Sequence, residues 1–281
     1  MVNAYYPQTI EEALKLKSAM KNNAVLIMGG SDLMVRGSKA ENMIFLNSIS
    51  ELRQTKCTEN ELIIGAGCTY CELIENDDVP DILRSIMMEI ASPAVRNAGT
   101  VVGNICNASP AGDMLPVLYA MDAVIVAASF ASEQSIVTRR IPVEDFIIGV
   151  RKTSLGSDEI VTAVEIPRSS YEGMTKLEHT KVGARKAEAI SKLSFVGLMK
   201  IEQNTIADIR IAFGAVGTTV IRERKIEKDM IGKTVEEIIG NKDVITDSYD
   251  KLLHPIDDQR STAQYRKKVC RNLLCDFLEC R

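Results

Sequence analysis

The order of apolar and polar positions near the start of the chain predicts a small β-α-β unit. Thr9 and Glu12 have the spacing of a capping box. The apolar residues that follow recur at roughly helical intervals, at Ile10, Ala13, Leu14 and Met20. This pattern predicts a helix over about residues 9–21. Apolar runs at 24–28 and 43–46 have the length of short buried strands.

Further apolar segments predict two regions of mixed helix and strand. The expected strands are 61–64, 123–128, 136–141, 159–166, 190–201 and 206–216. The expected helices are 69–75, 81–90, 115–121, 234–239 and 261–277. Residues 168–174 are polar and rich in breakers, so they predict a domain boundary. In the last helix the expected packing face consists of Tyr265, Val269, Leu273 and Phe277.

Residues 91–122 form the most unusual stretch of the chain, ASPAVRNAGTVVGNICNASPAGDMLPVLYAMD. Three glycines lie there among asparagines, serines, aspartates and prolines, a composition that does not favour a long helix or strand. Glycine permits close backbone approach, and Asn and Ser form local hydrogen bonds. Because the stretch has little charge and lies between apolar segments, we expect an ordered loop. Such a loop is suited to a phosphate or a planar cofactor.

MGGSD, at residues 28–32, is a second glycine loop that directly follows an apolar run. Backbone N–H groups of Gly29, Gly30 and Ser31 in a tight turn would form an anion-binding concavity, to which Ser31 adds a hydroxyl. The Asp32 carboxylate would repel a phosphate, so we expect it to cap the following segment. Taken alone, MGGSD is also compatible with a simple turn. Two glycine loops from different parts of the chain nevertheless suggest one dinucleotide held at both ends.

The remaining motifs point to a cofactor rather than to catalytic side chains. GAGCTY, at residues 65–70, has two glycines of the dinucleotide fingerprint but Tyr70 in place of the third, so a plain strand-to-helix turn is the better interpretation. In the second loop, Thr100 and Asn104 could bind phosphate or ribose oxygens, and Gly103 could run against a flat ring. There is no Ser-His-Asp layout, HExxH, P-loop or paired-carboxylate signature. We therefore expect a bound cofactor to carry the chemistry.

The bulk composition is that of an ordinary globular protein: 281 residues, 46% hydrophobic and 26% charged. A net charge of −4 argues against a nucleic-acid or membrane-surface partner. No apolar run has transmembrane length and the N-terminus lacks a signal layout, so a cytoplasmic location is expected. Seven cysteines at this length indicate free thiols. Cys68 and Cys71 form a CxxC, for which we expect a structural role, and no metal site is predicted.

At its glycine loops the chain resembles the FAD-binding subunit of the molybdenum hydroxylases, the family of xanthine and carbon monoxide dehydrogenases. LIMGGSDL at 26–33 resembles the family's first FAD loop, and RNAGTVVGNICNASPAGD at 96–113 resembles the second. Three later segments also match in order: EIVTAVEIP at 159–167, KVGARKAEAISKLS at 181–194 and HPIDDQRSTAQYRKKV at 254–269. The likeness therefore runs almost from end to end. One departure is Val102, which replaces a glycine of the family's T-I-G-G motif and is expected to strain the loop if that glycine is needed.

The resemblance implies an α+β fold and a set of FAD contacts. The fold would be a two-part FAD-binding domain of PCMH type over 1–170, with subdomains of about 1–55 and 56–170, followed by a smaller sheet-plus-helix domain over 171–281. The first loop would wrap the FAD pyrophosphate, and Ile90 and Cys106 would flank the isoalloxazine. The full implied set is Ile27, Met28, Gly29, Gly30, Ser31, Asp32, Leu33, Ile90, Thr100, Gly103, Asn104, Cys106, Asn107, Asp113, Val161 and Lys181.

The function implied by the resemblance is that of an electron-transfer flavoprotein subunit in a heteromeric molybdenum hydroxylase. A molybdopterin-binding large subunit and a [2Fe-2S] small subunit would be its partners, in a heterotrimer or its dimer. Electrons would pass from the [2Fe-2S] clusters through FAD to NAD⁺, and the holoenzyme would be a xanthine or other purine dehydrogenase. Two alternatives remain open: a non-catalytic scaffold with the same fold, and a stand-alone FAD reductase of the enolpyruvyl-sugar reductase type.

Overall fold

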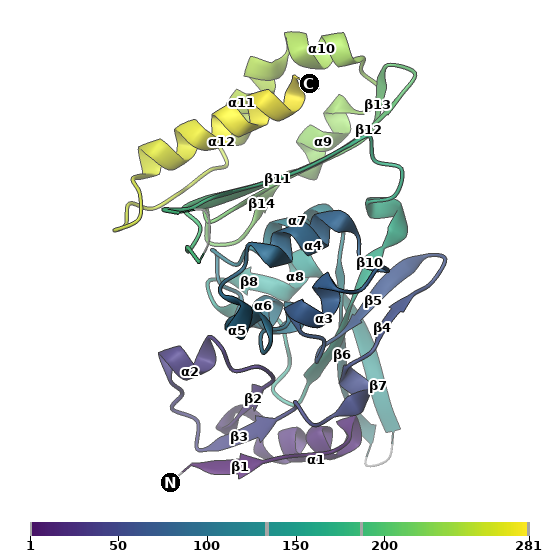
Figure 1. Cartoon of the computed structure of the whole chain (residues 1–281), viewed down its shortest axis with the longest axis vertical. Helices are drawn as coiled ribbons and strands as arrows, with labels where there is room; N and C mark the ends of the chain where they lie inside the picture. The colour runs from purple at the N-terminus through teal and green to yellow at the C-terminus, as the bar shows by residue number, and fades with distance from the viewer. Residues whose placement is uncertain (1, 133–134, 186–187, 280–281) are drawn as a thin grey trace. The chain divides into compact units, whose positions relative to one another are not determined.

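A computed structural model describes residues 2–132, 135–185 and 188–279 (Figure 1). Its contacts divide the chain into two compact units that do not follow chain order. Unit 1 comprises Met1–Val79, Ala91–Ala108 and Ala123–Arg168, and unit 2 comprises Pro80–Ile90, Ser109–Asp122 and Ser169–Arg281. The domain limits expected from the sequence remain a prediction. Lys186 and Ala187 of the KVGARKAEAISKLS segment lie outside the described residues.

Unit 1 begins with a three-stranded parallel sheet in the order β1-β3-β2, formed by β1 (Asn3–Tyr5), β2 (Ala24–Ile27) and β3 (Asn42–Phe45). The predicted first helix is confirmed as α1 (Ile10–Met20), where the Thr9 side chain accepts a hydrogen bond from the Glu12 N–H. The reciprocal bond goes to the N–H of Gln8 rather than to that of Thr9. The three-residue β1 was missed because so short a segment carries no periodicity.

A second, antiparallel sheet of unit 1 has the order β4-β5-β10-β6-β7. Its strands are β4 (Thr55–Cys57), β5 (Glu61–Gly65), β6 (Val124–Ser132), β7 (Ser135–Pro142) and β10 (Ile160–Pro167), and β8 (Ile147–Gly149) pairs separately with β9 (Lys152–Thr153). The helices are α2 (Leu33–Arg36), α3 (Tyr70–Ile74), α5 (Pro93–Arg96), α6 (Val101–Asn107) and α8 (Val143–Phe146), and the 3₁₀ turns are Lys21–Asn23, Ser50–Leu52 and Arg168–Ser170. The glycine-rich stretch that was expected to form an ordered loop therefore contains the short helices α5 and α6.

Unit 2 is built on the antiparallel sheet β11-β12-β13-β14. Its strands are β11 (Lys176–Val182), β12 (Leu193–Glu202), β13 (Thr205–Gly214) and β14 (Ile221–Arg222), and its helices are α4 (Asp81–Met88), α7 (Met114–Ala120), α9 (Arg224–Met230), α10 (Val235–Gly240), α11 (Lys242–Asp250) and α12 (Ala263–Leu278). Helices α11 and α12 cover one side of the sheet, and α4 and α7 lie on the other (Figure 1). Phe195, Phe213, Tyr249 and Phe277 pack together in the core under α11 and α12.

The buried face of α12 differs from the one expected. Tyr265 is 44% exposed, whereas Cys270, Leu274, Phe277 and Leu278 are buried. A residue turns the helix by about 100°, so positions four apart drift by about 40° at each step and do not stay on one face. Of the expected stripe, Phe277 reaches the centre of the core, and Val269 and Leu273 are partly buried against it. The Phe277 ring lies against Gly197 of β12, where a Cβ would be 2.6 Å from a ring carbon.

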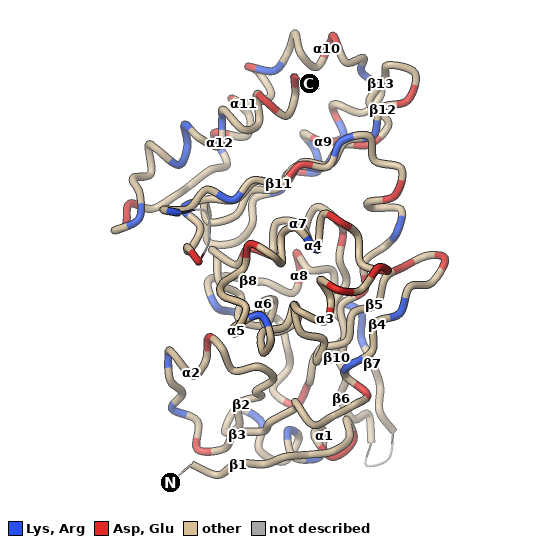
Figure 2. Tube along the Cα trace, viewed as in Figure 1, with Lys and Arg blue, Asp and Glu red and all other residues tan. Residues whose placement is uncertain are grey.

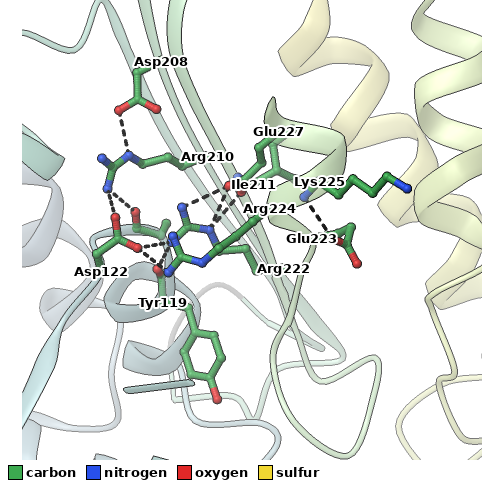
Figure 3. Close-up of polar contacts among 11 residues, drawn as sticks. Tyr119, Asp122, Asp208, Arg210, Ile211, Arg222, Glu223, Arg224, Lys225 and Glu227 are labelled. Carbon is green, nitrogen blue, oxygen red and sulfur yellow. Dashed lines mark hydrogen bonds and ion pairs between the residues drawn. The ribbon is translucent and has the colours of Figure 1, made fainter. Parts of the chain in front are cut away.

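Charged residues also tie unit 2 together. Asp122, which follows α7, accepts hydrogen bonds from Arg210, Arg222 and Arg224 (Figure 3). The side chain of Arg222 is 4% exposed and is also paired with Glu227. Basic and acidic residues both occur along β11 (Figure 2).

Helices and sheets are mixed in both units, so the expected α+β class is confirmed. Within the described ranges, no helix combines the length and apolar character required to cross a membrane.

Candidate cofactor site

The two glycine loops of unit 1 are in direct backbone contact. A Cβ placed on Gly29 would be 1.8 Å from the carbonyl oxygen of Ala98 and 3.2 Å from the nitrogen of Gly99. Only glycine allows such an approach without a shift of the backbone. Residues far apart in the sequence are therefore brought together, as expected for loops that serve one ligand.

The first loop presents a row of backbone donors. Gly30 has φ +66°, and its carbonyl accepts a hydrogen bond from Met34. Within the described part of the chain, the N–H groups of Gly29, Gly30 and Ser31 have no hydrogen-bond acceptor. Successive N–H groups in such a turn bind anions. The loop therefore keeps three donors available for a ligand.

Asp32 does not act as the expected cap. Asp32 is the residue before α2, but its side chain makes no capping hydrogen bond. Instead, its Oδ2 accepts a hydrogen bond from Arg36 Nε at 2.6 Å and one from Arg151 Nη1 at 3.3 Å. The two guanidinium groups thus give the carboxylate charge-assisted hydrogen bonds in place of a cap.

The second loop runs into α6. Thr100 caps this helix by accepting a hydrogen bond from the N–H of Gly103 at 2.9 Å. Val102 lies in the first turn, is 4% exposed and does not have a positive φ, so the backbone accommodates valine there without left-handed strain. Cys106 is exposed, and the Asn107 side chain accepts a hydrogen bond from Arg151 Nη1 at 2.6 Å.

Tyr70 packs against the second glycine loop at Gly99. Its N–H donates to the carbonyl of Gly99 at 3.0 Å, and a Cβ on Gly99 would be 3.1 Å from the Tyr70 ring. Tyr70 begins α3, which is capped by Thr69 and Glu72. GAGCTY is thus a strand-to-helix turn, as predicted. Tyr70, the residue that departs from the dinucleotide fingerprint, therefore packs against Gly99 of the second glycine loop.

Three of the implied FAD residues, Ile90, Asp113 and Lys181, belong to unit 2. Asp113 Oδ2 accepts from Lys181 Nζ at 2.7 Å, and its Oδ1 accepts from Ser191 Oγ at 2.5 Å. Lys181 also donates to the carbonyl of Glu89 at 2.9 Å, and its side chain is only 5% exposed. Both residues therefore have protein partners. Ile90 is buried two positions after the end of α4.

His179 lies two positions before Lys181 on β11. Burial lowers the pKa of His179 to about 4; the Asp113 carboxylate opposes this shift, and the Lys181 ammonium adds to it. The Nε2 atom of His179 is buried and has no partner among the described residues. His179 is therefore neutral at physiological pH.

The other implied residues lie in the framework of unit 1. Ile27 is buried at the end of β2, Val161 is 4% exposed in β10, and Met28 and Leu33 are partly buried. Sequence reasoning missed Arg36 and Arg151, which bind Asp32, and Ser191, which binds Asp113. The i,i+4 spacing of Asp32 and Arg36 is a local signal for that pair. No local signal identifies the other two, because Arg151 lies 119 positions from Asp32 and Ser191 lies 78 positions from Asp113.

Comparison with known proteins decides the family. Residues 1–169 match the FAD binding domain in molybdopterin dehydrogenase, and residues 178–280 match the CO dehydrogenase flavoprotein C-terminal domain. The chain belongs to the FAD-binding subunits of the molybdenum hydroxylase family. The expected resemblance and the order of its two parts are confirmed.

Individual members resemble this flavoprotein subunit over nearly their whole length. It is 30% identical to the glyceraldehyde dehydrogenase medium chain of Sulfolobus acidocaldarius, over 95% of this chain and 93% of that protein. It is 29% identical to the caffeine dehydrogenase subunit beta of a Pseudomonas species, over 94% of this chain and 88% of that protein. The reconstituted CO dehydrogenase from Oligotropha carboxidovorans contains a chain with the same fold, with a TM-score of 0.89 at 21% identity over 98% of this chain and 96% of that one.

The residues of the flavoprotein subunit fit a dinucleotide. Besides the free donors of the first loop, the Oδ1 atom of Asn104 is buried without a partner among the described residues. A buried acceptor of this kind requires a donor, and a ribityl or ribose hydroxyl would supply one. The two loops therefore offer donors for phosphate and an acceptor for a hydroxyl.

The CxxC pair shows no sign of a cofactor role. Burial raises the pKa of the Cys68 thiol, and its Sγ lies 3.4 Å from Thr55 Oγ1. A buried thiol with a raised pKa is a poor nucleophile and a poor metal ligand. Within residues 2–132, 135–185 and 188–279, no group of three or more His, Cys, Asp or Glu is arranged to hold a metal ion.

Proposed function

We propose that this subunit binds FAD between its two glycine loops and transfers electrons within a heteromeric molybdenum hydroxylase. The observation that carries the proposal is the contact of Gly29 with Ala98, because it joins the loops into one surface. The free N–H groups of Gly29, Gly30 and Ser31 would hold the pyrophosphate. On the second loop, Thr100, Gly103, Asn104 and Asn107 would bind the rest of the dinucleotide.

FAD supplies the redox chemistry when bound, since it accepts single electrons and donates hydride. The role of the chain would be to bind FAD in a fixed position and a fixed polar environment. Cys106 and Ile90 would flank the ring, Val161 would support it, and Asp113 and Lys181 would also contact the cofactor. In this proposal the FAD-binding domain covers residues 1–170 and the C-terminal domain covers 171–281.

The proposed electron donors are the [2Fe-2S] clusters of a small subunit, and the proposed acceptor is NAD⁺. A large subunit would hold molybdopterin and the substrate, in a heterotrimer or its dimer. We favour xanthine or another purine as substrate, and one relative is named for caffeine and another for xanthine. Other relatives are named for glyceraldehyde and carbon monoxide, in line with a substrate pocket outside this chain.

The test begins with the full chain purified after expression alone and together with its partner subunits. The expected result is an absorption spectrum of oxidised flavin, with about one FAD released by acid per chain. NADH should then bleach the flavin band. A colourless chain that does not take up added FAD would overturn the proposal. With the partners present, reduction by xanthine but not by glyceraldehyde or carbon monoxide would support a purine substrate.

The alternatives have less support. The scaffold hypothesis depended on strain at Val102, and that residue has an ordinary helical backbone. The relatives named above are medium chains or subunits, which favours a subunit over a stand-alone reductase. Retention of FAD by the chain without reduction by NADH or by the partner clusters would bring the scaffold hypothesis back.

A further inference from the structure

The first glycine loop contains a carboxylate that should oppose its ligand. Asp32 directly follows Ser31, the last of the three residues with free N–H groups, and its side chain is 46% exposed. A carboxylate in that position repels a diphosphate through space. Any function of the loop as a pyrophosphate site therefore requires that the charge of Asp32 be neutralised.

Two arginines provide this neutralisation. Arg36 Nε lies 2.6 Å and Arg151 Nη1 lies 3.3 Å from the same Oδ2 atom of Asp32. The cluster of two guanidinium groups and one carboxylate therefore carries a net positive charge. Arg36 is the last residue of α2, the short helix that follows the loop, but Arg151 comes from the turn between β8 and β9.

Arg151 also contacts the end of the second loop. Its Nη1 donates to Asn107 Oδ1 at 2.6 Å, and its own N–H donates to the carbonyl of Ala108 at 2.8 Å. Arg151 has φ +54°, a left-handed conformation that is unfavourable for a residue with a side chain. The surrounding hydrogen bonds thus hold the side chain between Asp32 and Asn107 despite backbone strain.

We propose that Arg151 is a positioning residue for the FAD diphosphate. It holds the Asp32 carboxylate away from the free N–H groups, offsets its charge and joins the first loop to the end of α6. The inference rests on the proposed FAD function. It predicts discrimination between dinucleotide and mononucleotide, because the bridged loops serve the pyrophosphate, which FMN lacks.

The test measures FAD and FMN dissociation constants of the full chain by quenching of flavin fluorescence, at low and high NaCl. R151Q should weaken FAD binding by about five- to ten-fold, the range for loss of a half-exposed charge-assisted contact, and should change FMN binding much less. The salt dependence of FAD binding should decrease as well. R53Q is the matched control, because Arg53 is a similarly exposed arginine of unit 1 paired with Glu72 at 3.2 Å.

A second substitution separates positioning from general damage. If Arg151 acts by neutralising Asp32, R151Q/D32N should recover most of the lost FAD affinity. Equal FAD affinity of R151Q and the parent chain would overturn the inference, as would a double variant no better than R151Q. If R151Q does not fold, the comparison of D32N with R151Q/D32N makes the same distinction. Failure of the parent chain itself to bind FAD would instead overturn the proposed function.

Discussion

The carboxylate of Asp122 accepts a hydrogen bond from Arg222 Nη1 at 2.7 Å, and Arg222 also donates to the carbonyl of Tyr119 (Figure 3). Arg210 binds the second oxygen of Asp122 at 2.6 Å. Although burial opposes it, the guanidiniums of Arg222 and Arg210 hold the pKa of Asp122 below its ordinary value. This single carboxylate therefore links the end of α7 to β13 and β14.

Replacing Asp122 by Asn should destabilise the protein. Asn is nearly isosteric and tolerates the left-handed backbone of this position, φ +53°, so the variant removes the charge alone. Arg222 keeps Glu227 as a partner, but the negative charge shared by Arg210, Arg222 and Arg224 is lost, and the expected loss in the free energy of unfolding is about 3 kcal/mol. Urea denaturation measures it, with E202Q as control, because Glu202 belongs to an exposed pair. Equal denaturation midpoints for D122N and the parent would show that Glu227 suffices.

The contact between the glycine loops gives a second prediction. In G29A the new methyl group would overlap the carbonyl oxygen of Ala98, so one loop must move. We expect FAD affinity to fall more than ten-fold, in keeping with the sensitivity of preorganised sites to displacements of about 1 Å. G240A is the control, since a Cβ there meets nothing within 4 Å. Unchanged FAD affinity in a folded G29A chain would show that the loops do not act together.

The sequence was informative where the physical cause is local. Helix α1 follows from a cap and a repeat of apolar residues, and the two glycine loops follow from composition. Asp32 shows where prediction from neighbouring residues fails. Its position before a helix predicted a capping role, yet its carboxylate binds Arg151, which lies 119 positions away in the sequence. Chain order likewise conceals that residues 80–90 and 109–122 pack with the C-terminal sheet. Short strands such as β1 depend on their partners and carry too little pattern to be found alone.

A third prediction concerns the buried pair of Asp113 and Lys181, whose side chains are 13% and 5% exposed. K181M leaves the carboxylate of Asp113 with Ser191 as its remaining hydrogen-bond partner among the described residues, and the free energy of unfolding should fall by about 3 kcal/mol. The double variant D113L/K181M should regain much of that stability, because no unpaired charge remains.

The same variants test the proposed contact of this pair with FAD. If Lys181 and Asp113 touch the cofactor, D113L/K181M should bind FAD less tightly than the parent even after its stability has recovered. FAD affinity equal to that of the parent in the double variant would assign the pair a structural role only. K200M is the control, because Lys200 lies on the same sheet in an exposed pair.

The last prediction follows from the buried histidine. The folded chain binds a proton at His179 only near pH 4, whereas an unfolded chain binds it near pH 6.5. Between these values the unfolded state holds more protons, so stability is complete above pH 6.5 and decreases as the pH falls toward 4. From pH 7 to pH 5 the contribution of His179 to the free energy of unfolding should drop by about 2 kcal/mol.

Denaturation of the parent and of H179Q at both pH values measures this contribution. H179Q cannot be protonated, so it should lose about 2 kcal/mol less than the parent over the same interval. H254Q is the control variant, because the other histidine, His254, is exposed. Parallel pH profiles of H179Q and the parent would mean that His179 is hydrated in solution. In that case Asp113 and Lys181 would also be reached by water, and the loss predicted for K181M would be smaller.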